Sequence, residues 1–139
     1  MRTTLEREES AMQFHAASVS ASAAGDYYQL LLGPEELHDE EADLYEVRGP
    51  YLLVQRQFEM HDGGRCYIEM HNEAYIGHFP LRLTEVSPTR LAFEIERKTN
   101  NRVDISFALN ASEFEEVQRV AEIIFGLKEP EPDGNDDAL

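Results

Sequence analysis

Apolar and polar residues alternate along most of this chain with a period of two, which is typical of β-strands. Gly, Pro, Asn and Asp separate the alternating segments, so the connections between them are predicted to be short. The segments lie at residues 13–20, 27–32, 51–58, 66–70, 75–83, 91–96 and 103–109. The pattern therefore predicts an antiparallel meander of about six to seven strands with one solvated face.

Two of these segments carry further information. In the segment 51–58, the odd-numbered residues, including Tyr51 and Gln55, fall on one side, and the even-numbered residues from Leu52 to Phe58 fall on the other. In the segment 75–83, Pro80 interrupts the alternation. Proline cannot donate a hydrogen bond to a neighbouring strand, so the sequence predicts a bulge or a sheet edge at this position.

The period changes to three and four residues near the C-terminus, which predicts a helix at about residues 112–125. Two overlapping capping boxes offer a start, Ser112 with Glu115 and Asn110 with Glu113, and Gly126 is placed to end the helix. The apolar stripe of this helix consists of Phe114, Val117, Val120, Ala121 and Ile124. The predicted fold class is α+β, with the helix packed on one face of the sheet.

Length and composition predict one globular domain. The chain has 139 residues, of which 42% are hydrophobic, and contains one cysteine, Cys66, which is predicted to be a buried thiol. No apolar run approaches the roughly 18 residues that a membrane helix needs, and residues 1–10 do not resemble a signal peptide. We expect a flexible N-terminus at 1–10, a single domain at 11–127, an acidic disordered tail at 128–139, and a cytoplasmic location.

Negative charge is spread unevenly over the chain. The formal net charge is −16, and the segment from Glu35 to Glu46 carries seven carboxylates with no Lys or Arg. The tail adds a second acidic cluster. A concentrated negative field predicts a protein partner with a basic surface and argues against binding to nucleic acid or to an anionic membrane.

Residues that could support catalysis or metal binding are few. The best grouping is His71 and His78 with Glu69 or Glu73, which leaves a metal site or a hydrolase open as a minor alternative. Hydrogen-bonded or solvated histidines at strand ends are the favoured interpretation. The chain shows no phosphate-binding glycine loop and no nucleophile elbow, so we expect no enzymatic activity, no cofactor and no metal.

The region from Tyr67 to Leu127, together with the strand at residues 50–56, carries a layout that resembles the immunity protein 10 family of bacterial polymorphic-toxin systems. A strand with a central acid, Glu69, leads to a Tyr–Gly step at Tyr75 and Gly77, and paired strands and a short C-terminal helix follow. The resemblance covers roughly residues 12–127 and departs from the family pattern at residues 78–80. It implies a protein that neutralises a toxin by occlusion, is made beside that toxin and acts in the cytoplasm.

Two hypotheses for the function result. In the first, the chain is an immunity protein that binds a cognate toxin, possibly a basic nuclease, through its acidic segment and a nearby aromatic anchor. In the second, it is a small non-catalytic structural or regulatory binding module, such as a homodimer formed through an exposed sheet edge. The predicted partner-contact residues of the first hypothesis are Glu35, Glu36, Asp39, Glu40, Glu41, Asp43, Tyr45 and Glu46.

Overall fold

The computed structural model describes residues 11–34, 49–58 and 65–130, and within them it contains nine strands, one 3₁₀ helix and one α-helix. The α+β class with a C-terminal helix is confirmed. In chain order the elements are β1 (Ala11–His15), β2 (Ser18–Ala24), β3 (Tyr27–Gly33), β4 (Leu52–Gln57), β5 (Cys66–Met70), η3 (Glu73–Tyr75), β6 (Gly77–Phe79), β7 (Leu81–Ser87), β8 (Arg90–Ile95), β9 (Arg102–Ser106) and α2 (Ala111–Ile124).

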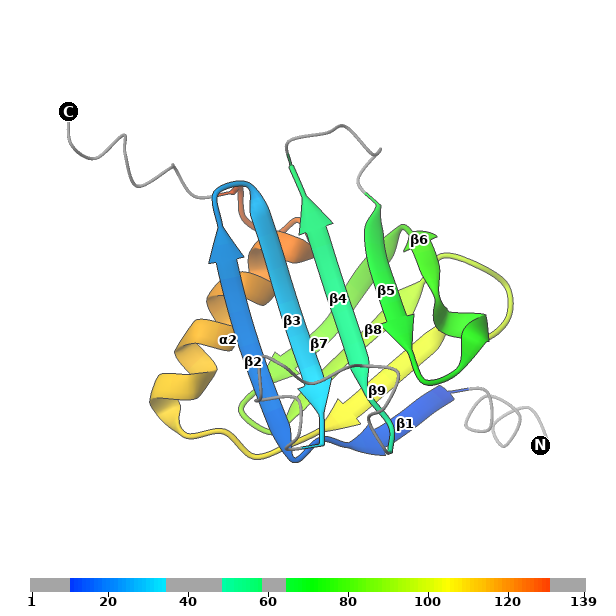
Figure 1. The fold of residues 1–139 in the computed structure, drawn as a ribbon, viewed down its shortest axis with the longest axis horizontal. Coiled ribbons are helices and arrows are strands. Elements are labelled where there is room, and N and C mark those ends of the chain that lie inside the picture. The colour runs from blue at the N-terminus through cyan, green and yellow to red at the C-terminus, as the bar shows by residue number, and fades with distance from the viewer. Residues whose placement is uncertain (1–10, 35–48, 59–64, 131–139) are drawn as a thin grey trace.

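The strands form two sheets that pack face to face. One sheet has four strands in the order β1-β9-β8-β7, and the other has five in the order β2-β3-β4-β5-β6. All neighbouring strands are antiparallel except β1 and β9, which are parallel. Figure 1 shows the five-stranded sheet in front of the four-stranded sheet, with the strands of the two layers crossing. Each sheet therefore has an inner face, turned toward the other sheet, and an outer face.

Two of the seven predicted strands are broken, which is why nine strands are observed. The segment 13–20 is divided at Ala16 and Ala17, and the segment 75–83 is divided at Pro80. At each break the chain leaves an edge strand of one sheet and enters an edge strand of the other. Pro80 thus lies between two edge strands, β6 and β7, as the missing N–H group predicts, and the bulge in β7 falls between Leu83 and Glu85.

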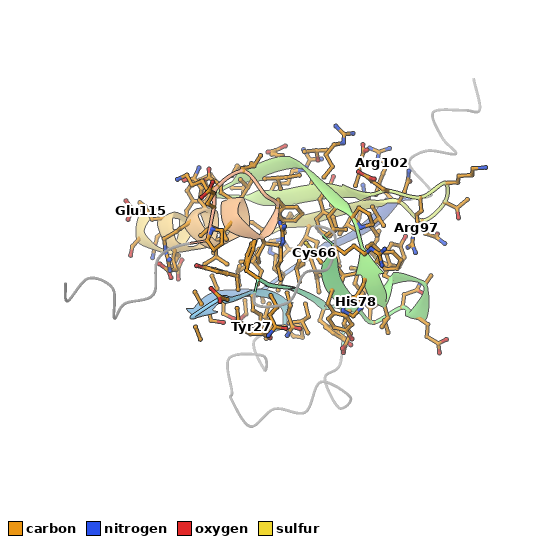
Figure 2. All side chains as sticks on the ribbon, turned by 90° about the horizontal axis from the view of Figure 1, so that it is seen from above. Tyr27, Cys66, His78, Arg97, Arg102 and Glu115 are labelled. Atoms are coloured by element: carbon orange, nitrogen blue, oxygen red, sulfur yellow. The ribbon has the colours of Figure 1, made fainter. Side chains whose placement is uncertain are left out.

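The core lies between the two sheets. Leu30, Val54 and Ile68 are successive cross-strand partners on β3, β4 and β5, and all three are fully buried. Burying an aliphatic side chain of this size contributes roughly 1.5–3 kcal/mol relative to leaving it exposed. Cys66 also points into this space and is buried, which confirms the predicted buried thiol (Figure 2).

Helix α2 closes one side of the space between the sheets, where it contacts β2, β3 and β7 (Figure 1). Of the two capping boxes in the sequence, Asn110 with Glu113 is the one that forms, so Ser112 lies inside the first turn. At the other end, Gly126 has φ = 81° and its N–H donates to the Ile123 carbonyl, while the N–H of Leu127 donates to the Glu122 carbonyl. This is a Schellman motif, and it ends the helix where the sequence predicts.

Arg56 ties the end of the helix to β4. Its Nη1 donates to the carbonyl oxygen of Ile124 at 3.0 Å, and its guanidinium lies 4.5 Å from the centre of the Phe58 ring. A positive charge at a helix C-terminus interacts favourably with the helix dipole. This contact fixes the position of the helix relative to the five-stranded sheet.

In the described part of the chain, no helix is both long and apolar enough to cross a bilayer. The predicted flexible N-terminus at 1–10 and most of the predicted tail, residues 131–139, lie outside the described residues. Residues 128–130 follow the helix and carry no regular secondary structure.

Candidate functional site

The outer face of the five-stranded sheet carries aromatic and amide side chains in ordered rows. Gln29, Gln55, Tyr67 and His78 are successive cross-strand partners on β3, β4, β5 and β6. Figure 2 shows Tyr27 and His78 both pointing away from the other sheet. We call this surface the tyrosine face, and it consists of Tyr27, Gln29, Leu31, Tyr51, Leu53, Gln55, Tyr67, Glu69 and His78. Within it, Tyr51 and Leu53 are buried, whereas His78 is exposed.

Hydrogen bonds hold one end of the tyrosine face in place. The hydroxyl of Tyr27 donates to Oε1 of Gln29 at 2.9 Å, and Nε2 of Gln55 donates to the same oxygen at 2.8 Å. Burial raises the pKa of Tyr27, so the phenol stays protonated and remains a donor at neutral pH. The amide of Gln29 is therefore fixed by donors from its own strand and from the next one.

Glu69 lies in the other half of this face, between two tyrosines. The Tyr51 hydroxyl donates to its Oε2 at 2.8 Å, and the Tyr67 hydroxyl donates to its Oε1 at 2.9 Å. Glu69 is the only carboxylate that β2 to β6 place on the outer side of the sheet within the described residues. A carboxylate has about four lone-pair positions, so two donors leave Glu69 able to accept further hydrogen bonds.

The two histidines of the minor metal-site alternative pack against these tyrosines. The His78 ring lies 5.1 Å from the Tyr67 ring, and the His71 ring lies 6.3 Å from the Tyr51 ring and 5.7 Å from that of Phe14. In residues 11–34, 49–58 and 65–130, no group of three or more His, Cys, Asp or Glu side chains is placed to hold a metal ion. The predicted grouping of His71, His78 and Glu69 or Glu73 is therefore not assembled as a metal centre.

The three residues that carry the family resemblance do not form one site. Glu69 lies on the tyrosine face, whereas Tyr75 is buried in η3 with the Arg97 guanidinium 5.3 Å from its ring centre. Gly77 has φ = 150°, and a Cβ there would lie 3.0 Å from the Phe79 ring. Tyr75 and Gly77 therefore have structural roles, and Glu69 is the one motif residue that faces outward.

The outer face of the four-stranded sheet has a different chemistry. Arg82 pairs with Glu94, and Arg90 pairs with both Glu85 and Asp104. The hydrogen bond from Arg90 holds the pKa of Asp104 below its ordinary value. We call this surface the charged face, and its three arginines and three carboxylates are Arg82, Arg90, Arg102, Glu85, Glu94 and Asp104.

The predicted partner-contact segment, from Glu35 to Glu46 with Tyr45, lies outside the described residues. The sequence predicts Tyr51 and Gln55 on one side of their strand, and the structure agrees, since Gln55 pairs with Tyr67 and the Tyr51 hydroxyl donates to Glu69 on the same face. The sequence did not single out Tyr27, Gln29 or Tyr67 as surface residues. A polar or aromatic residue occupies positions 27 and 29 and every second position of 65–69. No local pattern shows that these strands belong to the same face.

Comparison with known proteins does not assign this chain to a family. A scan against protein-family models gives no match for this chain, and a search of the curated proteins gives none. The resemblance to the immunity protein 10 family therefore stays a prediction from the sequence.

Proposed function

We propose that this chain is an immunity protein that neutralises a cognate bacterial toxin in the cytoplasm by direct binding, without catalysis of its own. The tyrosine face carries the contact, and the acidic segment at residues 35–46 steers a basic toxin toward it. The sequence resemblance supplies the class of partner. The composition and order of the tyrosine face supply the binding surface.

The observation that carries this proposal is the tyrosine face itself. Protein interfaces are enriched in tyrosine and depleted in charged residues at their centre, and tyrosine contributes a large contact area for a small loss of side-chain entropy. Here Tyr27, Tyr67 and two glutamines lie on the adjacent strands β3, β4 and β5, and Tyr51 lies directly before β4. Glu69 is the single carboxylate among them. Their mutual hydrogen bonds hold these side chains in position before a partner arrives. Such preorganisation reduces the entropic cost of binding.

Glu69 supplies the polar specificity in this arrangement. Its two oxygens each accept one tyrosine hydroxyl, so the carboxylate is oriented and retains acceptor capacity toward the outside. A lysine or arginine of the partner can bind there through a charge-assisted hydrogen bond. The net charge of −16 favours the same kind of partner and increases the association rate more than the affinity.

The test uses the toxin domain encoded beside this gene, purified in an inactive form. Calorimetry is expected to give a one-to-one complex with a dissociation constant of about 1 nM to 1 µM. Reversing the charges of the acidic residues in 35–46 is expected to slow association and to reduce its dependence on salt. Neutralising Glu129, Glu131, Asp133, Asp136 and Asp137 in the tail is the matched control, and it is expected to change the association rate much less.

Two results would count against the proposal in separate ways. Absence of binding to the neighbouring toxin would remove the immunity function. Binding that is unchanged in rate and salt dependence after charge reversal of 35–46 would remove the steering role of that segment while leaving the tyrosine face as the contact.

A further inference from the structure

The strand edges of the two sheets are not equally protected against pairing with another chain. An exposed edge presents free N–H and C=O groups, and proteins usually block it with short strands, charged residues, proline or bulges. Edge strand β6 has three residues and is followed by Pro80. Edge strand β7 contains a bulge between Leu83 and Glu85 and carries Arg82. Both of these edges thus have the usual protection. The fourth edge strand, β1, lacks Asp, Glu, Lys and Arg as β2 does, but it is shorter, with five residues.

Edge strand β2 has none of these features. It is seven residues long, its register with β3 is continuous from Ser18 to Ala24, and it contains only Ser, Ala and Val. Among the described residues, no hydrogen bond joins the free backbone edge of β2 to another element. Helix α2 lies between the two layers, on the inner side of this sheet (Figure 2), and residues 22–24 are exposed. In a chain with 29% charged residues, an uncharged, unbroken edge of this length stands out.

The sequence of β2 is complementary to itself in an antiparallel arrangement. A two-fold axis beside Ala21 pairs Ser20 of one copy with Ser22 of the other, and it pairs Val19 with Ala23. Directly opposite residues in an antiparallel pair point to the same side of the sheet. Ser20 and Ser22, which share the outer side with Leu31 and Gln29, therefore meet each other, and Ser18 meets Ala24. The apolar residues of the inner side meet apolar residues. No bulky or charged side chain of β2 opposes the approach.

We propose that β2 pairs with β2 of a second copy of this chain and forms a two-fold symmetric dimer. The two five-stranded sheets then join into one continuous sheet. Because the axis stands perpendicular to the sheet, the tyrosine faces of both copies lie on the same side of it. The dimer presents two partner-binding surfaces side by side, and this arrangement does not depend on the identity of the partner.

The strand that pairs with the free edge of β2 belongs to a second copy of this chain rather than to a basic partner protein, because β2 has no negative charge that would attract a basic strand. The uncharged run extends from Ala11 to Gly25, so the edge itself contains no carboxylate that would select lysine or arginine. The net charge of −16 on each copy opposes association at long range, and salt screens that repulsion. The dimer is therefore expected to become tighter as the salt concentration rises, which is opposite to the expected behaviour of a complex with a basic toxin.

Sedimentation velocity of the full chain tests the proposal. We expect a monomer of 15.9 kDa in equilibrium with a species of twice that mass. A single strand pair is a small interface, so a dissociation constant of about 1–100 µM is expected, falling several-fold between about 0.05 M and about 0.5 M NaCl.

Two double variants of Ser20 and Ser22, one with like charges and one with opposite charges, test whether β2 is the edge that forms the dimer. Ser20→Lys combined with Ser22→Lys places lysine opposite lysine twice across the axis and is expected to weaken the dimer about tenfold or more. Ser20→Glu combined with Ser22→Lys places glutamate opposite lysine twice and is expected to keep the dimer. Thr84→Lys on the protected edge β7 is the control and is expected to leave the equilibrium unchanged. Circular dichroism confirms folding, and Ser22→Lys alone serves if the double variant does not fold.

A chain that stays monomeric at every concentration and salt condition would overturn the proposal. So would a dimer that survives the lysine–lysine variant, or one that the glutamate–lysine variant disrupts as strongly. None of these outcomes bears on toxin binding, which is measured separately with the tyrosine face intact.

Discussion

The two outer faces of this domain use the same strand geometry for opposite chemistry. The charged face carries three arginines and three carboxylates that neutralise one another across β7, β8 and β9. The tyrosine face carries one carboxylate among aromatic and amide side chains on β3 to β6. Both surfaces are ordered by cross-strand contacts, but on the second a partner would have to desolvate only one charged group, Glu69.

The contrast indicates which face is suited to a partner. Covering the charged face would remove six ionised groups from water, and recovering that cost requires near-ideal geometry. Covering the tyrosine face removes from water the half-exposed Tyr27 and Tyr67, the exposed His78 and one carboxylate, Glu69, which already accepts two hydrogen bonds within the protein. The net charge of the whole chain, −16, does not reveal this difference, because neither face contributes much to it.

Tyr67→Ala is expected to have the largest effect on toxin binding. It removes an aromatic side chain at the centre of the tyrosine face together with one donor to Glu69. A loss of affinity of about 2 kcal/mol or more, roughly 30-fold, is expected from calorimetry. Arg82→Ala on the charged face is the matched control, and an equal loss for both variants would contradict the distinction between the faces.

Arg90→Met is expected to reverse that pattern by lowering stability without affecting binding. The guanidinium donates to Asp104 through Nε at 2.8 Å and through Nη2, and it also pairs with Glu85. Because these groups are partly exposed, the expected loss is about 1–2 kcal/mol in the free energy of unfolding by urea. A change in toxin affinity of more than about threefold would show that the charged face takes part in binding after all.

The difference in stability between the unsubstituted protein and the Asp104→Asn variant is expected to depend on pH. The pKa of Asp104 is lowered in the folded protein, chiefly by its hydrogen bond with Arg90. A lowered pKa means that the stabilisation is fully present above the unfolded value of about 3.9 and is lost as the pH falls through the folded value. The free energies of urea unfolding of the two proteins should therefore differ by about 1 kcal/mol from pH 5 to pH 7, and the difference should shrink as the pH falls below the folded pKa. A difference that stays constant as the pH falls below the folded pKa would rule out the charge as its source.

Tyr51→Phe is expected to have the smallest effect of the four. It removes one of the two hydroxyls that orient Glu69 and keeps the aromatic ring. The expected loss is about 0.5–1 kcal/mol in the free energy of unfolding, since one partly buried hydrogen bond is lost. Tyr67→Phe at the more exposed donor is the comparison, and a smaller loss is expected there. The opposite order would mean that burial does not set the strength of these two bonds.

Local features of the fold could be predicted from the sequence because they depend on neighbours along the chain. The helix, its Asn110–Glu113 capping box and its Gly126 terminus were all available from spacing alone. The burial of Cys66 was predictable from its apolar neighbours and from the usual burial of a free cysteine. The two sides of the 51–58 strand were predictable from alternation. The missing donor of Pro80 indicated an edge, and the structure places this residue between two edges.

The candidate site could be predicted only in part. Glu69 was identified through the family resemblance, and alternation assigned Tyr51 to one side of its strand. No pattern in the sequence indicated that these two residues are in contact. The two residues are 18 positions apart and meet because β4 pairs with β5 in one particular register. Gln29 and Gln55, 26 positions apart, meet for the same reason on β3 and β4.

The sequence by itself determined which residues alternate, where the helix ends, and which segments carry the negative charge. Only the tertiary structure decided that two breaks in the strands carry the chain from one sheet to the other, and that one outer face gathers tyrosines while the other gathers ion pairs. The physical reason is the range of the interactions. Periodicity and capping depend on contacts a few residues apart, whereas strand order and register depend on how distant segments share one core.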